Sequence, residues 1–248
     1  MRNRFVDAFD VILLDQGKTF MFENDRFGPG VDYYPAYVHT GGSKLSRRQV
    51  QSIMDRLVER LFQIWEDLQQ CNSFPRVGDV LKEMRENGPE GSKLNDAEIQ
   101  RIDMMVSLHE IGTISSRHAA SLKALAARYR LGIISNVWGP KEPFEDNLKR
   151  AGVFPCFEHI VWSSDYGCVK PDPRLFHVAL QHFGVDPARV LFVGDSPQRD
   201  VHPARKLGCS AVWITNNESG REGGDTDYPL DLLPPDLIIS DLSELVDA

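Results

Sequence analysis

Short apolar runs recur along the chain and alternate with longer amphipathic segments. Each run is rich in Val, Ile and Leu, as a strand of a parallel sheet that is buried on both faces requires. From Ser116 onward, segments with helical periodicity separate the runs. This alternation predicts an α/β fold with a doubly wound parallel sheet. The predicted strands are Val11–Leu14, Leu131–Ile134, Ile160–Trp162, Val190–Val193, Ala211–Ile214 and Leu237–Ile239.

A different pattern occupies residues 45–110, where apolar residues recur at steps of three and four without any strand signal. Ser46 and Gln49 have the spacing of a capping box, which predicts the start of a long helix. A second helix is expected to end at Asn87 and a third to start at Asn95. The block is too long for a simple crossover between strands, so it predicts an inserted helical cap.

Residues 23–44 carry glycines and prolines among aromatic residues, with neither helix nor strand periodicity. This composition predicts a linker or a flap. Its tyrosines could line a ligand site, although a hinge that packs its own aromatic side chains is the favoured explanation. They are Tyr33, Tyr34 and Tyr37. The expected domains are a core made of residues 1–22 and 116–248, and a cap with linkers at residues 23–115.

Charge and composition narrow the possible partners. The 248 residues include 36 acidic and 28 basic side chains, for a net charge of −8. Without a basic excess to displace counterions, the chain is not expected to bind nucleic acid or an anionic membrane. The four cysteines form no C-x-x-C pair, and no apolar run is long enough to cross a membrane. We therefore expect a cytoplasmic protein.

Polar side chains follow three of the predicted strands. Asp15, Ser135 and Asp195 each stand where a strand ends. A turn or a helix cap explains any one of them, and Lys170 and Asp200 could equally be a surface cation and a cap. Independent caps have no reason to converge, however, and the carboxyl ends of parallel strands form the edge where open α/β sheets bind ligands. The five residues together predict a site at this edge.

Four motifs around these residues resemble those of the haloacid dehalogenase-like (HAD) superfamily. They read V-I-L-L-D-Q-G-K-T around Asp15, L-G-I-I-S-N around Ser135, C-V-K-P-D-P-R-L-F around Lys170, and V-L-F-V-G-D-S-P-Q-R-D around Asp195. The last two are the most specific. The resemblance covers nearly the whole chain and implies the fold expected above, with the helical cap inserted after the first motif.

The resemblance also implies a hydrolase that acts on a small phosphorylated metabolite. Asp15 would be the nucleophile and would form an aspartyl-phosphate. Lys170 would neutralise negative charge, and Ser135 would donate a hydrogen bond to a phosphoryl oxygen. A Mg²⁺ cofactor is expected, because hard oxygen ligands suit it and it offsets the repulsion between carboxylate and phosphate. The implied metal-site residues are Asp15, Gly17 through its carbonyl, Asp195 and Asp200, and substrate binding is expected from Lys18, Thr19 and Asn136.

The first motif departs from the D-x-D-G-T of similar metal-dependent phosphatases. Gly17 replaces the second aspartate, which serves as general acid and base, and Lys18 replaces the glycine. Loss of such a group typically lowers the rate by about 10²–10⁴-fold. The sequence therefore leaves open a slow or specialised phosphohydrolase, and a non-catalytic protein that binds phosphate, metal or a protein partner.

Two other members of the superfamily also lack the second aspartate. Haloacid dehalogenases need no metal, whereas Asp195 and Asp200 here stand in the metal-binding form of the fourth motif. Phosphonoacetaldehyde hydrolases use a cap lysine that forms a Schiff base. The candidates for that lysine are Lys44, Lys82 and Lys93.

A nucleotide-binding P-loop is excluded, because G-K-T at residues 17–19 lacks the glycine that would have to stand at Ile12.

Overall fold

The computed structural model describes residues 5–22, 27–28, 30–87, 94–215 and 228–247. Within these residues, six parallel strands form one sheet in the order β3-β2-β1-β4-β5-β6. The first strand therefore lies at the centre, between β2 and β4, as the α/β prediction requires. The strands are β1 (Val11–Leu14), β2 (Arg130–Ser135), β3 (Phe157–Trp162), β4 (Val190–Gly194), β5 (Ser210–Ile214) and β6 (Leu237–Ile239).

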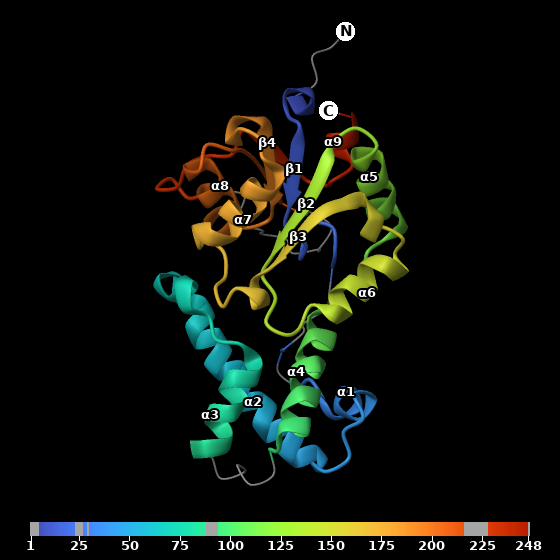
Figure 1. Cartoon of the computed structure of the whole chain (residues 1–248), viewed down its shortest axis with the longest axis vertical. Helices are drawn as coiled ribbons and strands as arrows, with labels where there is room; N and C mark the ends of the chain where they lie inside the picture. The colour runs from blue at the N-terminus through green and yellow to red at the C-terminus, as the bar shows by residue number, and fades with distance from the viewer. Residues whose placement is uncertain (1–4, 23–26, 29, 88–93, 216–227, 248) are drawn as a thin grey trace.

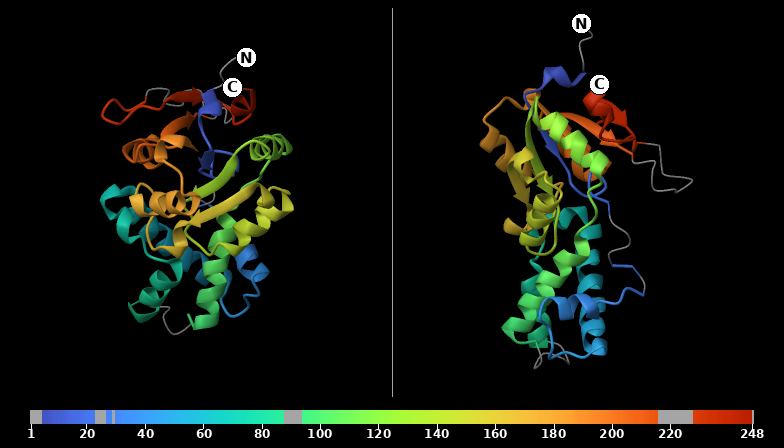
Figure 2. Two further views of the ribbon diagram at one scale, coloured as in Figure 1. Left: turned by 45° about the horizontal axis from the view of Figure 1, so that its top comes forward. Right: turned by 90° about the vertical axis from the view of Figure 1, so that its right-hand side faces the viewer.

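Helices cover both faces of the sheet (Figure 2). Alternate residues of β1 separate the two faces: Ile12 and Leu14 pack with one group of helices, and Val11 and Leu13 pack with the other. Both faces of the strand are thus buried, which explains its unbroken apolar sequence. The first group is α5 (Ser116–Ala126), α6 (Glu142–Arg150) and α9 (Glu244–Asp247), and the second is α7 (Pro173–Phe183) and α8 (His202–Lys206).

Four further helices lie beyond the carboxyl ends of the strands and form what we call the helical part (Figure 1). They bury a hydrophobic cluster of their own, separate from the two on the faces of the sheet. The capping predictions are confirmed, because Ser46 and Gln49 make the capping box and the Asn95 side chain accepts from the Glu98 backbone at 3.0 Å. The helices are α1 (Tyr34–His39), α2 (Arg47–Glu66), α3 (Val77–Asn87) and α4 (Asp96–Glu110).

The expectation that residues 23–44 contain no helix is wrong, because α1 lies within them. Residues 23–26 and 29 of this stretch lie outside the described residues. Tyr33 and Tyr37 are buried in the cluster of the helical part, and the Tyr37 hydroxyl donates to Glu98 and accepts from the Leu45 backbone. These contacts favour the explanation that the stretch packs its own aromatic residues. The helix is short and its local sequence pattern is weak, so its stability depends on packing contacts such as the burial of Tyr37.

The chain passes between the two parts twice, after β1 and before α5. Phe22 and Thr113 pair at this crossing through two backbone hydrogen bonds, of 2.9 and 2.7 Å. Two residues of loops at the edge of the sheet, Trp138 and Val169, are also buried in the cluster of the helical part. The helical part therefore packs directly against the edge where the strands end.

The loop after β2 is held by the end of α4. Glu110 is buried, and its carboxylate accepts from the backbone N–H groups of Trp138 at 2.9 Å and of Gly139 at 3.0 Å. The Ser107 hydroxyl, one turn earlier on the helix, donates to the Pro140 carbonyl at 2.7 Å. A carboxylate that accepts from two buried N–H groups makes a strong contact, since both bonds are charge-assisted.

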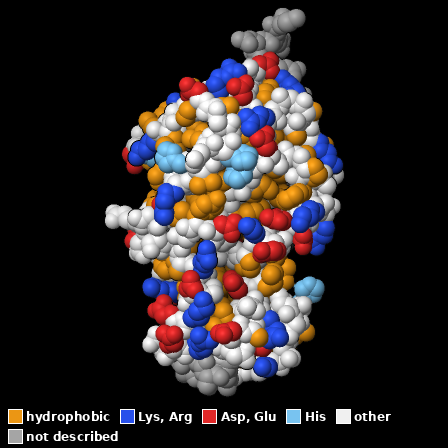
Figure 3. Space-filling model, viewed as in Figure 1, with side chains coloured by type: hydrophobic (Ala, Val, Ile, Leu, Met, Phe, Trp, Pro, Cys, Tyr) orange, Lys and Arg blue, Asp and Glu red, His pale blue; other side chains and the backbone are white. Residues whose placement is uncertain are grey.

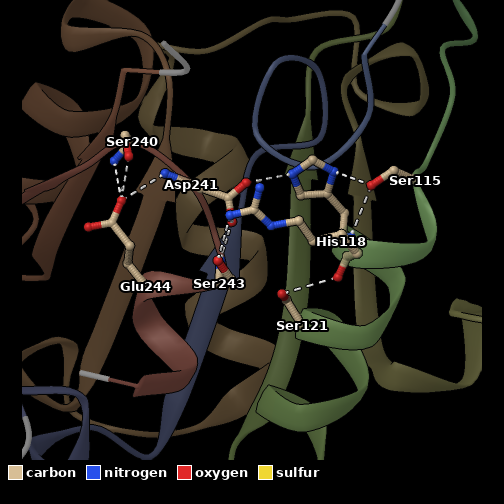
Figure 4. A network of polar contacts seen from close by, with 8 residues as sticks. Ser115, His118, Ser121, Ser240, Asp241, Ser243 and Glu244 are labelled. Atoms are coloured by element: carbon tan, nitrogen blue, oxygen red, sulfur yellow. Dashed lines mark hydrogen bonds and ion pairs between the residues drawn. The ribbon is translucent and has the colours of Figure 1, made fainter. Parts of the chain in front are cut away.

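The end of the chain is tied to α5 by a polar network (Figure 4). The buried His118 ring contacts the Ser115 hydroxyl at 2.8 Å and an Asp241 carboxylate oxygen at 3.2 Å. The Ser115 hydroxyl also accepts from the His118 backbone, so it caps α5. Glu244 accepts from Ser240 and from the Asp241 backbone. The network thus joins the segment that leads into α9 to α5.

The segment between β4 and β5 contains two helical pieces. A π-helical turn, Pro197–Val201, comes first, and α8 follows it. Such turns are frequent at functional sites, and this one carries Asp200.

The surface carries charges of both signs. On the face drawn in Figure 3, acidic and basic side chains are interspersed over both parts of the molecule. None of the described helices is both long and apolar enough to cross a membrane. The expected cytoplasmic location and the expected lack of binding to nucleic acid stay predictions.

Candidate active site

Neighbouring strands deliver the predicted acidic and hydroxyl side chains to one place. Leu14 pairs with Ile133 on one side and with Val193 on the other, so β1, β2 and β4 end almost level. Asp15 continues the ladder by donating its N–H to the Val193 carbonyl at 2.8 Å. Asp15 and Ser135 are 7% and 3% exposed, and Asp195 is half-buried. The convergence that the sequence predicts is thus present at the edge of the sheet that faces the helical part.

Lys170 stands between two of the carboxylates. Its Nζ lies 2.5 Å from an Asp15 oxygen and 2.7 Å from an Asp200 oxygen, and the side chain is almost completely buried. The other Asp200 oxygen accepts from the Ser196 backbone at 3.0 Å. Asp200 thus fixes the ammonium and the loop that carries Asp195. The buried ammonium of Lys170 is tolerated because one Asp15 oxygen and one Asp200 oxygen balance its charge.

Asp200 also requires glycine at the end of β4. A Cβ atom on Gly194 would come within 2.5 Å of the Asp200 carboxyl group. The chain must therefore lack a side chain at this position for the carboxylate to pack against the strand. This close approach gives a physical reason for the glycine of the fourth motif.

Negative charge in the site exceeds the positive charge that Lys170 brings. Burial, together with the nearby Asp200, raises the pKa of Asp15 to about 6, although Lys170 opposes this shift. Burial and the carboxylates of Asp15 and Asp200 raise the pKa of Asp195 well above its usual value. Burial works against the charged form of Lys170, yet the two carboxylates that it contacts raise its pKa overall.

The excess of negative charge fits a divalent cation. One oxygen from each of Asp15, Asp195 and Asp200 lies within 4.8 Å of the other two. Carboxylate oxygens are hard ligands of the kind that Mg²⁺ takes in phosphoryl-transfer sites. Asp15 and Asp195 are the better candidates for direct ligands, since both Asp200 oxygens have protein contacts. The expected role of the Gly17 carbonyl stays a prediction.

The residues expected to bind substrate lie in three different settings. The Asn136 amide is engaged with the Lys170 backbone, accepting its N–H at 2.7 Å and donating to its carbonyl at 3.3 Å. Thr19 is buried, and its hydroxyl has no hydrogen-bond partner among the described residues. Lys18 is exposed in a left-handed backbone conformation (φ 54°), and its charge opposes the rise in the pKa of Asp195. Their roles toward a substrate stay predictions.

Gln16 also contacts one of the site residues. Gln16 is completely buried, and its Oε1 accepts a long hydrogen bond, 3.5 Å, from the Ser135 hydroxyl. The adjacent Gly17 has no side chain. Neither position offers a carboxyl group near Asp15.

The described lysines that were candidates for a Schiff base lie on the surface. Lys44 and Lys82 are exposed, and Lys82 pairs with Asp79 on the surface at 2.9 Å. Lys93 lies outside the described residues. A Schiff-base lysine is normally desolvated to lower its pKa, and these two exposed side chains lack that setting.

Two further residues hold the site in place without having been singled out in the sequence. One is Glu110, which binds the loop after β2. The other is Arg199, which donates to the Lys170 carbonyl at 2.8 Å and stacks on Trp65 of α2. Both contacts join segments far apart in the sequence, so no local motif could reveal them.

Known proteins resemble this chain in part of its sequence. Residues 108–214 match the family model described as haloacid dehalogenase-like hydrolase. A phosphoserine phosphatase of Thermus thermophilus is 36% identical over 127 residues, which are 51% of this chain and 48% of that protein. The matched segment thus spans about half of the relative's length.

Solved structures match almost the whole chain. A 2-haloacid dehalogenase from Pseudomonas syringae pv. Tomato is 20% identical with a TM-score of 0.63, and covers 96% of this chain and 97% of its own. A HAD phosphatase from Thermococcus onnurineus has the same identity and coverage with a TM-score of 0.61. The fold is therefore shared with proteins of both activities, and the expected resemblance to the superfamily is confirmed.

Proposed function

We propose that this chain, which shares the fold of haloacid dehalogenase-like proteins and matches their family model over residues 108–214, is a Mg²⁺-dependent phosphohydrolase. Its substrate would be a small phosphate monoester, and Asp15 would be the nucleophile. The observation that carries the proposal is the buried contact of Lys170 with Asp15 and Asp200, close to a third carboxylate. This arrangement combines a nucleophile with the positive charge that an incoming phosphate needs.

In the proposed first step, an Asp15 oxygen attacks phosphorus. A bond forms between that oxygen and phosphorus, and the bond between phosphorus and the ester oxygen breaks. The ester oxygen leaves as an anion and takes a proton from water, since Gly17 and Gln16 offer no acid. Lys170 and Ser135 stabilise the negative charge on the phosphoryl oxygens as it develops. In the second step, water attacks phosphorus and the bond between phosphorus and the Asp15 oxygen breaks. Phosphate leaves, the attacking water releases a proton to solvent, and the Asp15 carboxylate is restored.

We assign the metal to Asp15 and Asp195, with Asp200 and the Gly17 carbonyl as additional candidates. When bound, Mg²⁺ would neutralise phosphate charge and orient the phosphoryl group for in-line attack. Asp200 would mainly hold Lys170, since its two oxygens contact Lys170 and the Ser196 backbone. Residues 23–115 would form the cap domain and its linkers, covering the site and restricting the substrate to a small molecule.

The name of the Thermus relative supports the class of substrate, a phosphate monoester, without specifying the alcohol. Halide displacement is the less favoured chemistry. A dehalogenase needs no metal, whereas the partly compensated carboxylates here fit a cation. The similarity of the fold to a dehalogenase does not decide between the two reactions.

A second candidate is a non-catalytic protein that uses the same site for binding. Gly17 favours it, because this position cannot protonate a leaving alcohol, and Gln16 beside it carries no acid either. If the protein is a hydrolase without a general acid, its rate should depend on the leaving group of the ester. An aryl phosphate needs little protonation, whereas an alkyl phosphate needs a general acid.

The test is turnover of aryl and alkyl phosphates with and without Mg²⁺. We expect slow hydrolysis that requires Mg²⁺ and favours the aryl ester, and its loss in Asp15→Asn. Unchanged hydrolysis in Asp15→Asn would rule out the mechanism. Failure to hydrolyse any ester, combined with hydrolysis after Gly17→Asp, would support the non-catalytic candidate. Release of chloride from a 2-chloroacid without metal would support the dehalogenase.

A further inference from the structure

Arg199 joins the proposed catalytic lysine to the helical part. Its Nη1 donates to the Lys170 carbonyl at 2.8 Å, and its Nη2 donates to the Trp65 carbonyl near the end of α2. The guanidinium carbon also lies 3.8 Å from the centre of the Trp65 ring. A single side chain thus contacts the backbone of Lys170 and the backbone and ring of Trp65.

The contact with α2 has a clear physical basis. The last four carbonyl groups of a helix have no partner within the helix and carry its partial negative charge. Trp65 is the residue before the end of α2, and Arg199 supplies a donor and a positive charge there. Burial lowers the pKa of Arg199, which the negative charge of Asp200 opposes. A planar guanidinium can stack flat on a ring while its in-plane N–H groups donate two hydrogen bonds, whereas a lysine ammonium has no planar face to stack.

The contact with Lys170 complements that of Asn136. The Asn136 amide accepts from the Lys170 N–H and donates to its carbonyl, and Arg199 donates to the same carbonyl. The peptide groups on both sides of the Lys170 Cα are therefore fixed. The position of its Nζ between Asp15 and Asp200 depends on this backbone.

We propose that Arg199 is a positioning residue that couples the packing of α2 to the placement of the Lys170 ammonium. When α2 is docked, Arg199 is held by Trp65 and in turn holds Lys170 in place for the reaction. This inference rests on the proposed function for its kinetic consequences. Its structural consequence, a link between the end of α2 and the Lys170 segment, does not depend on any activity.

The chain offers a matched control in Arg130. This arginine also donates to a backbone carbonyl, that of Phe183 at 3.0 Å, and lies over the ring of the same residue at 4.9 Å. It begins β2, at the opposite end of the strand from Ser135. Arg130→Gln therefore removes a carbonyl contact and a ring contact of the same kinds, together with an ion pair to Glu158, without touching the site.

The experiment compares Arg199→Gln with Arg130→Gln by kinetics on the best aryl phosphate. Displacement of a catalytic group by ~1 Å costs about 100-fold in rate. We expect kcat of Arg199→Gln to fall by about this factor while KM changes by less than about 3-fold, and Arg130→Gln to retain normal kinetics. Arg199→Lys should not rescue kcat. Equal effects of Arg199→Gln and Arg130→Gln on kcat would overturn the inference.

Hydrogen–deuterium exchange provides a readout without activity. In Arg199→Gln, peptides covering residues 62–68 and 168–172 should both exchange at least ~10-fold faster, the size expected for loss of about one stabilising hydrogen bond. The same peptides should be unaffected in Arg130→Gln. Faster exchange in only one of the two peptides would contradict the coupling. If the wild-type protein hydrolyses no ester while both peptides respond, the proposed function fails and the link stands.

A double-mutant cycle tests whether the two contacts of Arg199 act as one. Trp65→Leu removes the stacked ring and leaves the carbonyl group. If Arg199 acts through its docking on Trp65, the combined variant should lose less than the sum of the single losses in activation free energy. Additive losses would show that Trp65 and Arg199 act independently and would overturn the coupling.

Discussion

Asp103 is a partly buried carboxylate outside the proposed active site. It lies on α4, and burial raises its pKa to about 6, with Asp79 contributing in the same direction. Arg76 and Lys82 oppose the shift without cancelling it. A carboxyl group whose pKa is higher in the folded than in the unfolded state destabilises the fold once it ionises.

We therefore expect Asp103→Asn to stabilise the protein at pH 7.5. The folded wild-type protein binds more protons than the unfolded chain between pH ~4 and ~6, so its stability falls as the pH rises through this range. The gain in Tm for Asp103→Asn should be present above pH 6 and should vanish toward pH 4. Asp55→Asn, on the exposed side of α2, serves as the control for loss of an exposed carboxylate. A gain for Asp103→Asn that is equal at pH 4 and pH 7.5 would contradict the assignment.

At the scale of elements, the end of α4 and the loop after β2 depend on each other. Glu110 belongs to the helical part, and the two N–H groups that it accepts belong to the loop that follows Ser135 and Asn136. Gly139 also lies too close to Ser107 for a side chain, since a Cβ atom would come within 2.2 Å of the Ser107 hydroxyl. The loop therefore packs tightly against the helix.

Glu110→Ala should destabilise the fold by about 3 kcal/mol, because two buried N–H groups lose their charged acceptor. The free energy of unfolding in urea measures this loss. Glu244→Ala is the matched control, because Glu244 also accepts from loop N–H groups but is exposed to water, which can replace it. We expect a loss below about 1 kcal/mol for the control. Similar losses of unfolding free energy in both variants would show that the burial of Glu110 does not add to its contribution to stability.

At the scale of the whole molecule, the sheet and the helical part meet at a site with excess negative charge. Above pH ~6 the protein without metal carries the ionised Asp15, whose burial opposes ionisation, and the pKa of Asp195 is raised for the same reason. Ionisation of these carboxyl groups therefore lowers the free energy of unfolding of the protein. A bound cation would remove much of this loss.

We expect Mg²⁺ to raise the Tm more at pH 7.5 than at pH 5. At a concentration ~100 times its Kd, a ligand stabilises a protein by about 2.7 kcal/mol, which is about 5 °C or more for a protein of this size. At pH 5, protons on Asp15 and Asp195 compete with the metal, so the shift should shrink. NaCl at equal ionic strength and Asp195→Asn with Mg²⁺ are the controls. A shift of the same size in Asp195→Asn would exclude this cluster as the metal site.

The sequence by itself determined those features that depend on neighbours along the chain. The apolar runs of the strands, the cap at Ser46, the cap at Asn95 and the α/β class are confirmed. Their signals are local, because burial on both faces leaves a continuous apolar run and a helix start needs its own cap. The motifs also identified the residues that converge at the carboxyl edge of the sheet.

Only the tertiary structure decided what holds these residues in place. Arg199 reaches Trp65 across 134 positions, and Glu110 binds a loop 28 residues away. Tertiary contacts also stabilise α1, because its local sequence pattern is weak and its Tyr37 is buried. Such contacts depend on how two separately formed parts pack together. No periodicity or spacing in the chain encodes them, because their energy comes from partners that only folding brings near.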